Sequence, residues 1–274
     1  MAVPLRANAG EPARAAARPT AIQCRALTKV YETQDGSDLL ALEALDIAVS
    51  EGEFLAVVGP SGCGKSTLLR MVGGLLSYTA GDLMIGGERV TGPRRDIGVV
   101  FQAATLLEWR TVLENVMLPV DVLGLDRAKY RQRALDLLKT VGLGGFEAKY
   151  PNELSGGMQQ RVAISRALVH DPALLLMDEP FGALDALTRE TMNIELQRIW
   201  MEAGKTVLLI THSIPEAVFL ADRVAVMTAR PGKLQEVIEI DLPRPRSLDL
   251  MATPEFGRIA SRIRGLLNSG GALD

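Results

Sequence analysis

The segment from residue 59 to residue 66, GPSGCGKS, has the residue types and spacing of a phosphate-binding loop. Gly59, Gly64, Lys65 and Ser66 fit the pattern G-x-x-x-x-G-K-[ST] without gaps. Glycines let backbone N–H groups point at phosphate oxygens, the lysine places a charge on the β- and γ-phosphates, and the serine hydroxyl is a ligand for Mg²⁺. A tight turn without a ligand would not require a lysine. We therefore predict that this segment binds a nucleotide.

Cys63 lies inside this loop, close to the start of the helix expected after it. A thiol at such a position tends toward a lowered pKa, so one hypothesis is that Cys63 can be alkylated and that bound nucleotide shields it. The other interpretation, which we favour, is a small filler residue.

Two acids end an apolar strand-like run, ALLLMDEP at residues 173–180. Unpaired charges there would be costly, and a metal ion would give them a partner. We expect Asp178 to hold Mg²⁺, directly or through water. Glu179 is next along the expected strand, so its side chain should point the other way, toward the attacking water, as a general base. The alternative is a pair capping a helix N-terminus, which Pro180 and the apolar run disfavour.

Two further polar side chains follow predicted strands. His212 follows the apolar run TVLLI, and Gln102 ends DIGVVFQ. Ligands of open α/β sheets bind beyond the carboxyl ends of the strands. His212 is therefore expected to reach a γ-phosphate, and Gln102 to sense Mg²⁺ or water and pass its position to the segment that follows. His170 is expected to be a surface or packing histidine.

A second glycine-containing loop occurs far downstream, in LSGGMQQR at residues 154–161. Ser155, Gly156 and Gly157 precede a helical stretch, which is the composition of an anion-binding nest. The chain thus carries two phosphate-facing loops, and both can serve one nucleotide within one chain only if the intervening segment folds fully back.

The elements that must position these residues follow an α/β pattern. Strand-like runs at 53–59, 96–102, 173–178, 206–211 and 223–229 are separated by helical stretches, which indicates a parallel sheet covered on both faces. Residues 21–32 and 39–50 are expected to be antiparallel edge strands, and 82–90 a further strand.

Residues 105–150 show helical spacing with no strand candidate. Thr111 and Glu114 form a capping box, and Asp126 can cap a second helix that stops at Gly142. We predict a helical subdomain at about 103–158.

The chain then divides into a disordered tail at 1–19, a main domain at 20–245 and a helical tail at 246–274. In that last tail, residues 254–267 predict an amphipathic helix. It could lie on a membrane surface or, as we prefer, pack on the body.

Composition excludes several classes of protein. The 274 residues are 47% hydrophobic, enough for a large core, and the net charge of −3 with 4% aromatic residues argues against a nucleic-acid binder. Cys24 and Cys63 form no disulfide framework or zinc site, which fits a reduced setting. No apolar run is long enough to span a bilayer, and the first residues lack the apolar stretch of a secretion signal.

Taken together, the motifs resemble the ATP-binding subunit of an ABC transporter over roughly residues 20–245. GPSGCGKST resembles the Walker A motif, LLLMDEP the Walker B motif, and LSGGMQQR the more specific signature motif. The resemblance implies a P-loop NTPase (RecA-like) core with an antiparallel β edge subdomain and an inserted α-helical subdomain. It implies Glu179 as the catalytic glutamate, Gln102 as the Q-loop glutamine and His212 as the switch histidine. By the same resemblance ATP, with Mg²⁺, is bound by Tyr31 stacking on adenine, by Ser61, Gly62, Cys63, Lys65 and Thr67 of the loop, and by Asp185 of the ALD segment at 183–185.

The family also implies partners. Two copies pack head to tail, so that each ATP is held by Lys65 of one chain and by the Ser155–Gly157 loop of the other. Because the chain has no membrane segment, a separate integral-membrane permease must take up the motion, docked near Gln102 and the segment 106–116. Leu106, Leu107 and Trp109 could instead be plain core. The subunit is then peripheral, on the cytoplasmic face of the inner membrane, with a solute-binding protein as an indirect partner.

A narrower resemblance is to importers of the nitrate, sulfonate and taurine type. It rests on VFQAATLLEWRTVLENV, MDEPFGALDALTRE, THSIPEAVFLADRVAVM and ARPGKLQEVIEIDLPRPR. Glu108 departs from this group, which usually has proline before the tryptophan, and this bears on the permease. One alternative is a soluble ABC-type ATPase acting on nucleic acid or ribosomes. Another is a module that grips ATP without cleaving it, against which Glu179 and His212 argue.

Overall fold

The computed structural model describes residues 18–33, 36–182 and 184–269. The predicted tail at 1–19 therefore lies mostly outside the described residues, as do residues 270–274 and Ala183 of the ALD segment. No helix in the described ranges is both long and apolar enough to cross a membrane.

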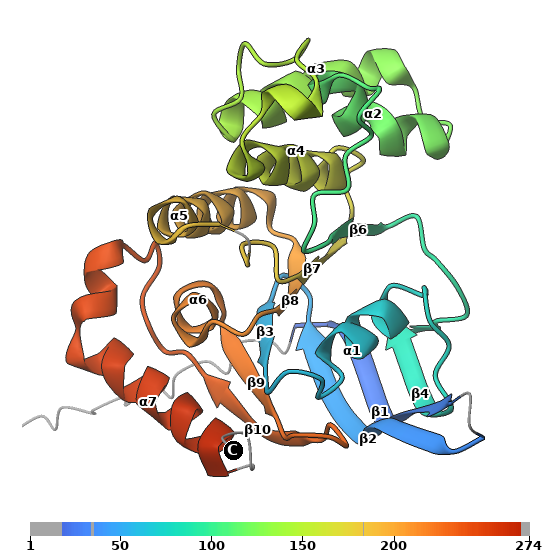
Figure 1. The fold of residues 1–274 in the computed structure, drawn as a ribbon, viewed down its shortest axis with the longest axis vertical. Coiled ribbons are helices and arrows are strands. Elements are labelled where there is room, and N and C mark those ends of the chain that lie inside the picture. Colours follow the sequence, from blue (N-terminus) through green and yellow to red (C-terminus); the bar gives the residue numbers. More distant parts are fainter. Residues whose placement is uncertain (1–17, 34–35, 183, 270–274) are drawn as a thin grey trace, which may run out of the picture.

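Two sheets form the body of the described chain (Figure 1). The larger has the order β10-β9-β3-β8-β7-β6; all neighbours are parallel except the antiparallel pair β9 and β10. The smaller is antiparallel, with the order β2-β1-β4-β5. The larger sheet comprises β3 (Phe54–Val58), β6 (Ile97–Val100), β7 (Leu174–Asp178), β8 (Thr206–Ile210), β9 (Arg223–Met227) and β10 (Leu234–Glu239), and the smaller β1 (Thr20–Glu32), β2 (Asp38–Ser50), β4 (Ala80–Ile85) and β5 (Glu88–Arg89). The predicted α/β class is confirmed.

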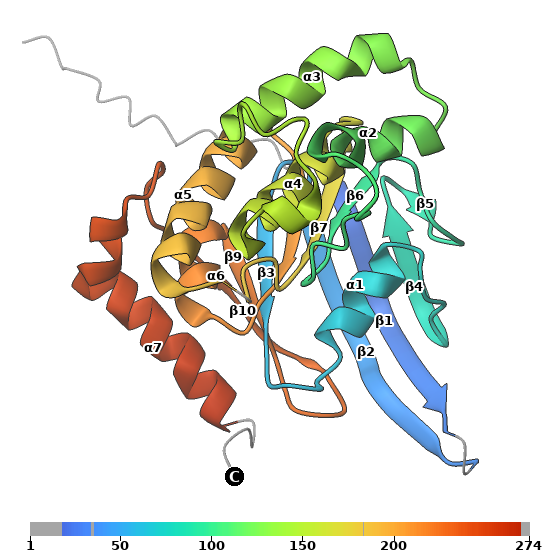
Figure 2. The same cartoon turned by 45° about the horizontal axis from the view of Figure 1, so that its top comes forward.

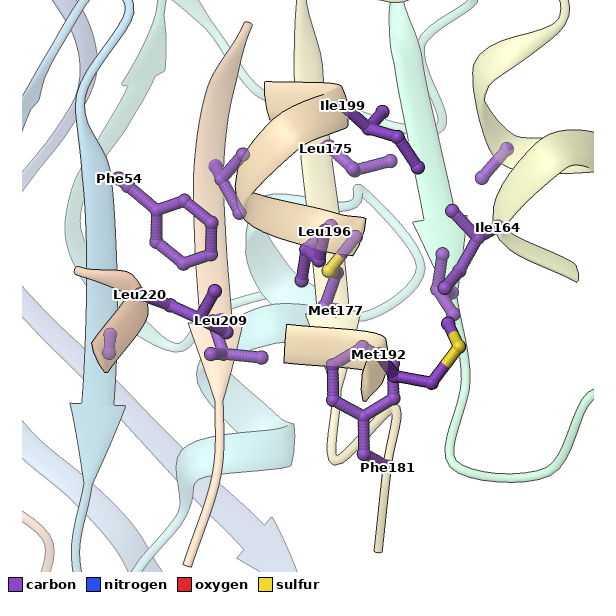
Figure 3. Close-up of a cluster of buried hydrophobic side chains, with 14 of the residues drawn as sticks. Phe54, Ile164, Leu175, Met177, Phe181, Met192, Leu196, Ile199, Leu209 and Leu220 are labelled. Atoms are coloured by element: carbon purple, nitrogen blue, oxygen red, sulfur yellow. The ribbon is translucent and has the colours of Figure 1, made fainter. Parts of the chain in front are cut away.

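The central strands are buried on both faces, as their unbroken apolar sequences predict. In β3, Phe54, Ala56 and Val58 point into one core cluster, whereas Leu55 and Val57 point into the other. This alternation follows from the two-residue period of a strand. Figure 3 shows the first cluster, where Met192, Leu196 and Ile199 of α5 pack over Leu175, Met177 and Leu209 of the sheet.

Helices cover the central sheet and form a separate layer above it (Figures 1 and 2). The α-helices are α1 (Lys65–Val72), α2 (Val112–Val122), α3 (Arg127–Thr140), α4 (Gly156–Leu168), α5 (Ala186–Ala203), α6 (Ile214–Leu220) and α7 (Pro254–Ser269), with 3₁₀ turns at Pro151–Glu153 and Leu248–Ala252. The predicted caps are present, because the Thr111 and Glu114 capping box opens α2 and Asp126 caps α3. The predicted boundary near residue 158 falls inside α4, which packs with α2 and α3.

Three sequence-based expectations differ from the structure. The single strand expected at 82–90 is two strands, because Gly86 and Gly87 have φ of 57° and 81° and turn the chain back. These strands join the antiparallel sheet. β10 was not predicted, since its alternation is weak and four of its six residues are half-buried. The strand expected to reach Gln102 ends at Val100.

The C-terminal helix α7 begins at Pro254 and packs along α6 and β9. Phe256 and Ile263 are its buried residues. Their spacing of seven places both on one face, as the amphipathic pattern predicts. These contacts place α7 against the body of the protein, which is the alternative preferred in the sequence analysis.

Candidate nucleotide-binding and catalytic site

The loop from Gly59 to Gly64 joins β3 to α1 at the carboxyl edge of the central sheet. Gly62 and Gly64 have φ of 74° and 100°, a conformation that favours glycine. The Lys65 ammonium folds back and donates to the carbonyl oxygens of Gly59 and Pro60, at 2.8 and 2.9 Å. Lys65 is 7% exposed and, within the part of the chain that the structure describes, forms no ion pair. The loop is thus preformed around a cation that lacks a counter-ion.

A pocket of about 290 Å³ opens above this loop. Most of its lining matches the sequence-based predictions: Tyr31, Ser61, Gly62, Gly64, Lys65, Ser66, Thr67 and Glu179. Sequence reasoning missed Leu39, Ala41 and Arg230 as lining residues. For Arg230 a signal was present, namely a basic residue directly after a strand of the parallel sheet in ARPGK, but no phosphate motif marks it.

Tyr31 lies in β1 and lines the same pocket, although it belongs to the other sheet. Its hydroxyl is 3.3 Å from Thr67 Oγ1, which ties the antiparallel sheet to the first turn of α1. The Lys29 ammonium lies 5.0 Å from the centre of the Tyr31 ring. An aromatic face at the mouth of the pocket fits the stacking role predicted for adenine.

Ser66 and Asp178 meet across the sequence. The Ser66 hydroxyl donates to Asp178 Oδ1 at 3.0 Å. Burial raises the pKa of Asp178 above its ordinary value, the Ser66 hydrogen bond opposes that rise, and the charge of Glu179 adds to it.

These two oxygens suit Mg²⁺, which binds one or two protein oxygens and completes its shell with phosphates and water. No cluster of three His, Cys, Asp or Glu side chains forms a metal cage in the described ranges. The donor set fits a metal that arrives with the nucleotide. Ser66 and Asp178 would hold it.

Glu179 does not follow the strand, contrary to the prediction that it is next along β7. The strand ends at Asp178, and Glu179 has a φ of 46°, in the left-handed region. Its N–H donates to the carbonyl oxygen of Ile210 in β8, and its own carbonyl accepts from the Gly182 N–H. A backbone turn, and not the strand pleat, therefore directs the side chain into the pocket.

One oxygen of Glu179 lies close to two polar side chains, His212 and Gln102, for which the sequence predicted roles toward phosphate and toward Mg²⁺ or water. His212 Nδ1 lies 3.0 Å from Glu179 Oε2, and the Gln102 amide nitrogen lies 3.5 Å from the same atom. Since a carboxylate only accepts, Nδ1 carries the hydrogen, and Nε2 is left for another partner. Glu179 Oε1 has no hydrogen bond to any other described residue. It is free to accept a hydrogen from a water molecule.

Cys63 is a filler residue. The side chain is fully buried, and burial raises its pKa, although the neighbouring Lys65 charge lowers it in part. A Cβ on Gly59 would lie 2.8 Å from the Cys63 sulfur, so the thiol packs under the loop. The lowered pKa considered for this thiol is not found, because desolvation outweighs the helix N-terminus.

The second glycine loop lies outside this pocket. Ser155 caps α4 by accepting from the Met158 N–H at 3.3 Å, and both Ser155 and Gly156 are exposed. A Cβ on Gly156 would meet no atom within 4 Å. None of Ser155, Gly156 and Gly157 lines the pocket. Within one chain this helix N-terminus therefore has open space before it.

Asp185 also lies outside the pocket. Its carboxylate caps α5 by accepting from the Thr188 N–H at 3.0 Å, and hydrogen bonding from the Thr188 side chain and backbone lowers its pKa. Because Asp185 does not line the pocket of the single chain, its contact with nucleotide stays a prediction.

The segment after β6 connects the pocket with the helical layer. The Gln160 amide of α4 donates to the carbonyl oxygen of Phe101, and Arg166 donates to those of Ala104 and Thr105. Gln102 is thus held between the site and α4. In the predicted docking segment, Leu106 packs on the core and Trp109 is 74% exposed.

His170, predicted to be structural, is half-buried with its Nε2 3.3 Å from the carbonyl oxygen of Ile97. Burial lowers its pKa.

Comparison with known proteins gives a consistent set of relatives. The family model described as ABC transporter matches residues 42–182. An uncharacterised ABC transporter ATP-binding protein of Methanocaldococcus jannaschii, MJ0412, is 52% identical over 80% of this chain and 82% of its own length. The taurine import ATP-binding protein TauB of Roseobacter denitrificans is 44% identical over 90% of this chain and 94% of its own. The aliphatic sulfonates import ATP-binding protein SsuB of Bacillus cereus is 41% identical over 90% and 96%.

A solved structure has the same fold. The ATP-binding cassette MJ0796, in a dimeric post-hydrolysis state bound to ADP and phosphate, superposes with a TM-score of 0.72 at 35% identity. The match covers 81% of this chain and all of that chain. The described chain therefore has the fold of an ATP-binding cassette.

Proposed function

The chain belongs to the ABC transporter family, and from this premise we propose that it is the ATP-hydrolysing subunit of an importer. It pairs head to tail with a second ATPase subunit on ATP and drives a separate membrane permease. One observation carries the proposal. Glu179, held by His212, lines the same pocket as Lys65 and Ser66, and Ser66 is bonded to Asp178, whereas the second phosphate-facing loop lies outside that pocket.

The residues divide the work of hydrolysis. Lys65 and the loop N–H groups bind the β- and γ-phosphates, and Tyr31 stacks on adenine. Ser66 and Asp178 would hold Mg²⁺, which would offset the charge of the phosphates when bound. Glu179 Oε1 orients water and accepts its proton, and His212 holds the carboxylate in place while its Nε2 faces the γ-phosphate.

The pairing of two chains gives the second loop its ligand. The N-terminus of α4 carries a partial positive charge and free N–H groups, and in one chain it faces open space. A second copy, rotated about a two-fold axis, brings its γ-phosphate to Ser155, Gly156 and Gly157 and produces two equal sites. Hydrolysis removes charge from both contacts and lets the halves separate.

The motion needs a membrane partner. An apolar groove of about 390 Å³ lies between β6, α2 and α4 and includes Phe101 and Val122, the latter 75% exposed. It adjoins Gln102, which contacts the catalytic carboxylate. We place a cytoplasmic helix of the permease in this groove and on the adjacent segment 106–116. A peripheral position on the cytoplasmic face of the inner membrane follows, with an external solute-binding protein acting through the permease.

The transported solute is a small anion of the sulfonate, taurine or nitrate kind. The support is the resemblance to importers of that type and the names of the taurine and sulfonate relatives. A soluble role on nucleic acid or ribosomes has no observation in its favour, and the net charge of −3 opposes it.

Glu179→Gln tests the proposed hydrolysis. Phosphate release should fall by about 10²–10⁴-fold, because the amide cannot accept the proton. ATP binding should persist, and size-exclusion chromatography should show a dimer that accumulates with MgATP. Glu51→Gln, an exposed glutamate on another face, is the matched control and should leave turnover unchanged. Unchanged phosphate release in Glu179→Gln would rule out Glu179 as the base.

Val122→Asp tests the groove. Co-purification with the cognate permease should be lost, while the ATPase rate of the isolated chain stays the same. Retention of the permease by this variant would remove the groove as its dock.

A further inference from the structure

The turn between β9 and β10, residues 228–233, lies against the outer side of the phosphate loop. Its backbone is held by Thr228, whose N–H donates to the Lys233 carbonyl and whose hydroxyl accepts from the Lys233 N–H at 3.1 Å. The same hydroxyl lies within hydrogen-bond distance of the carbonyl oxygens of Ala229 and Pro231. These hydrogen bonds within the turn fix its backbone conformation.

Three consecutive residues of the phosphate loop, Gly62, Cys63 and Gly64, lie against this turn or against the neighbouring strand β2. The Arg230 guanidinium donates to the carbonyl oxygen of Gly62 through Nε at 3.3 Å and Nη2 at 3.2 Å. A Cβ on Gly232 would lie 1.9 Å from the Cys63 carbonyl oxygen, and a Cβ on Gly64 would lie 2.8 Å from Leu42 Cδ2. Residues 62, 63 and 64 are thus each contacted from outside.

The turn is also fastened to β2, which forms another wall of the pocket. The Gly232 N–H donates to the Ala41 carbonyl, the Glu43 N–H donates to the Gly232 carbonyl, and Lys233 pairs with Glu43 at 3.0 Å. Ala41 and Arg230 both line the pocket. The turn therefore links two walls that are distant in sequence.

Arg230 differs from the other basic residue of the turn. Lys233 is neutralised by Glu43, whereas Arg230 has no carboxylate partner among the described ion pairs. The Arg230 guanidinium lines the pocket, and its Nε and Nη2 donate to the Gly62 carbonyl oxygen. This contact fixes the peptide unit between Gly62 and Cys63, whose N–H donates to the Pro60 carbonyl oxygen, and so fixes the backbone from which the other N–H groups of the loop can face the phosphates.

We propose that Arg230 is a positioning residue for the nucleotide: it braces Gly62 through the carbonyl oxygen of that residue and so sets the affinity of the phosphate loop for the polyphosphate of ATP and ADP. The inference rests on the proposed function, since it assumes that this pocket binds ATP. It makes no claim on the hydrolytic step, which belongs to Glu179.

The test compares Arg230→Ala, Arg230→Lys and Lys233→Ala, with dissociation constants for MgATP, MgADP and adenosine measured by titration calorimetry or by competition with a fluorescent nucleotide. Arg230→Ala should weaken MgATP and MgADP about 10-fold, the size of one lost charge-assisted hydrogen bond. KM should rise by the same factor, with the maximal rate within about 2-fold. Adenosine binding should not change. Arg230→Lys, which keeps the charge and one donor, should recover about half of the lost affinity on a logarithmic scale.

Lys233→Ala is the matched control, because it removes a cation from the same turn without touching Gly62, and it should change affinity less than about 2-fold. Thermal melting without nucleotide shows whether Arg230→Ala is folded. A folded Arg230→Ala protein with wild-type affinity overturns the inference, as does an equal loss in Lys233→Ala or for adenosine. Absence of MgATP binding in the wild-type chain would instead overturn the proposed function.

Discussion

The two glycine loops of this chain have similar compositions and opposite surroundings. The first, at residues 59–66, is enclosed: its glycines touch neighbouring atoms, its lysine is buried, and the β9–β10 turn braces it. The second, at residues 154–157, caps α4 and has exposed residues at its tip. The first loop is a finished site within one molecule. The second loop precedes a helix N-terminus, which favours anions, and under the proposed pairing its phosphate comes from a second molecule.

Ser155→Arg should break the second loop without touching the first. An arginine side chain would occupy the space before the helix N-terminus and displace a γ-phosphate brought by a partner. We expect turnover to fall by at least about 100-fold, the cost of losing such electrostatic contacts to the transferred group.

Binding of one ATP by the single chain should be unchanged in Ser155→Arg when measured by calorimetry. Ser269→Arg, at the exposed end of α7, is the control for added charge. Cooperative ATP cleavage by Ser155→Arg would contradict the shared site.

Gly64→Ala and Gly156→Ala should separate the two loops by stability. Alanine at position 64 must adopt a φ of 100° and would meet Leu42 and the Ala41 carbonyl at 2.8 and 3.0 Å. We expect a loss of about 3 kcal/mol from strain and overpacking. Alanine at position 156 meets nothing and begins a helix, so it should stabilise the chain by about 0.5 kcal/mol.

Thermal or urea unfolding of both glycine variants measures this difference. Equal stabilities of the two variants would show that the first loop is not as constrained as the contacts imply.

Glu216, in α6, should make the stability of the region around the nucleotide pocket depend on pH, and the region around the second glycine loop should lack this dependence. It lies under the turn that carries His212, bonded to the Thr211 hydroxyl, and burial raises its pKa from 4.5 to about 7. Between these values the folded chain holds a proton that the unfolded chain releases, so this contribution to stability falls as pH rises through the window.

From pH 5 to pH 7 the wild type should lose about 2 kcal/mol more than Glu216→Gln. Urea unfolding at the two pH values tests this, and parallel pH profiles of the two proteins would refute it.

The smallest expected effect is that of MgATP on the rate of thiol labelling. Cys63 is buried with a raised pKa, and burial raises the pKa of Cys24 to about 12. Iodoacetamide at pH 7.5 should therefore modify the native chain at least about 10-fold more slowly than a free thiol. MgATP should change the rate little. Rapid, nucleotide-protected labelling at Cys63 would mean that the first loop opens far more than its packing suggests.

Helix caps and buried strands could be predicted from the sequence, because each depends on residues close to one another in the chain. The capping box at Thr111 and the cap at Asp126 were read correctly, since a cap depends on residues two or three positions apart. The apolar runs that became β3, β7, β8 and β9 were read for the same reason. The pair of strands within 82–90 was read as one, because the apolar pattern alone does not show where two glycines reverse the chain.

Contacts between distant residues were predictable only through the motifs. That Glu179 faces the pocket was anticipated, but the reason was wrong: a left-handed backbone at Glu179 replaces the strand alternation that was assumed. Arg230 was not anticipated, because its contact with Gly62 depends on β9 lying next to β3 in the sheet. Strand order is a property of the whole fold.

The amino-acid sequence was enough to predict two phosphate-facing loops, an acid pair and a histidine, and the alternation of strands and helices between them, since spacing and periodicity are properties of neighbouring residues. The tertiary structure alone decided which of these meet. Ser66 reaches Asp178 across 112 positions and His212 reaches Glu179 across 33, because the parallel sheet gathers the carboxyl ends of its strands at one edge. The loop at 154–157 lies instead at the start of α4, in the helical layer, outside the pocket.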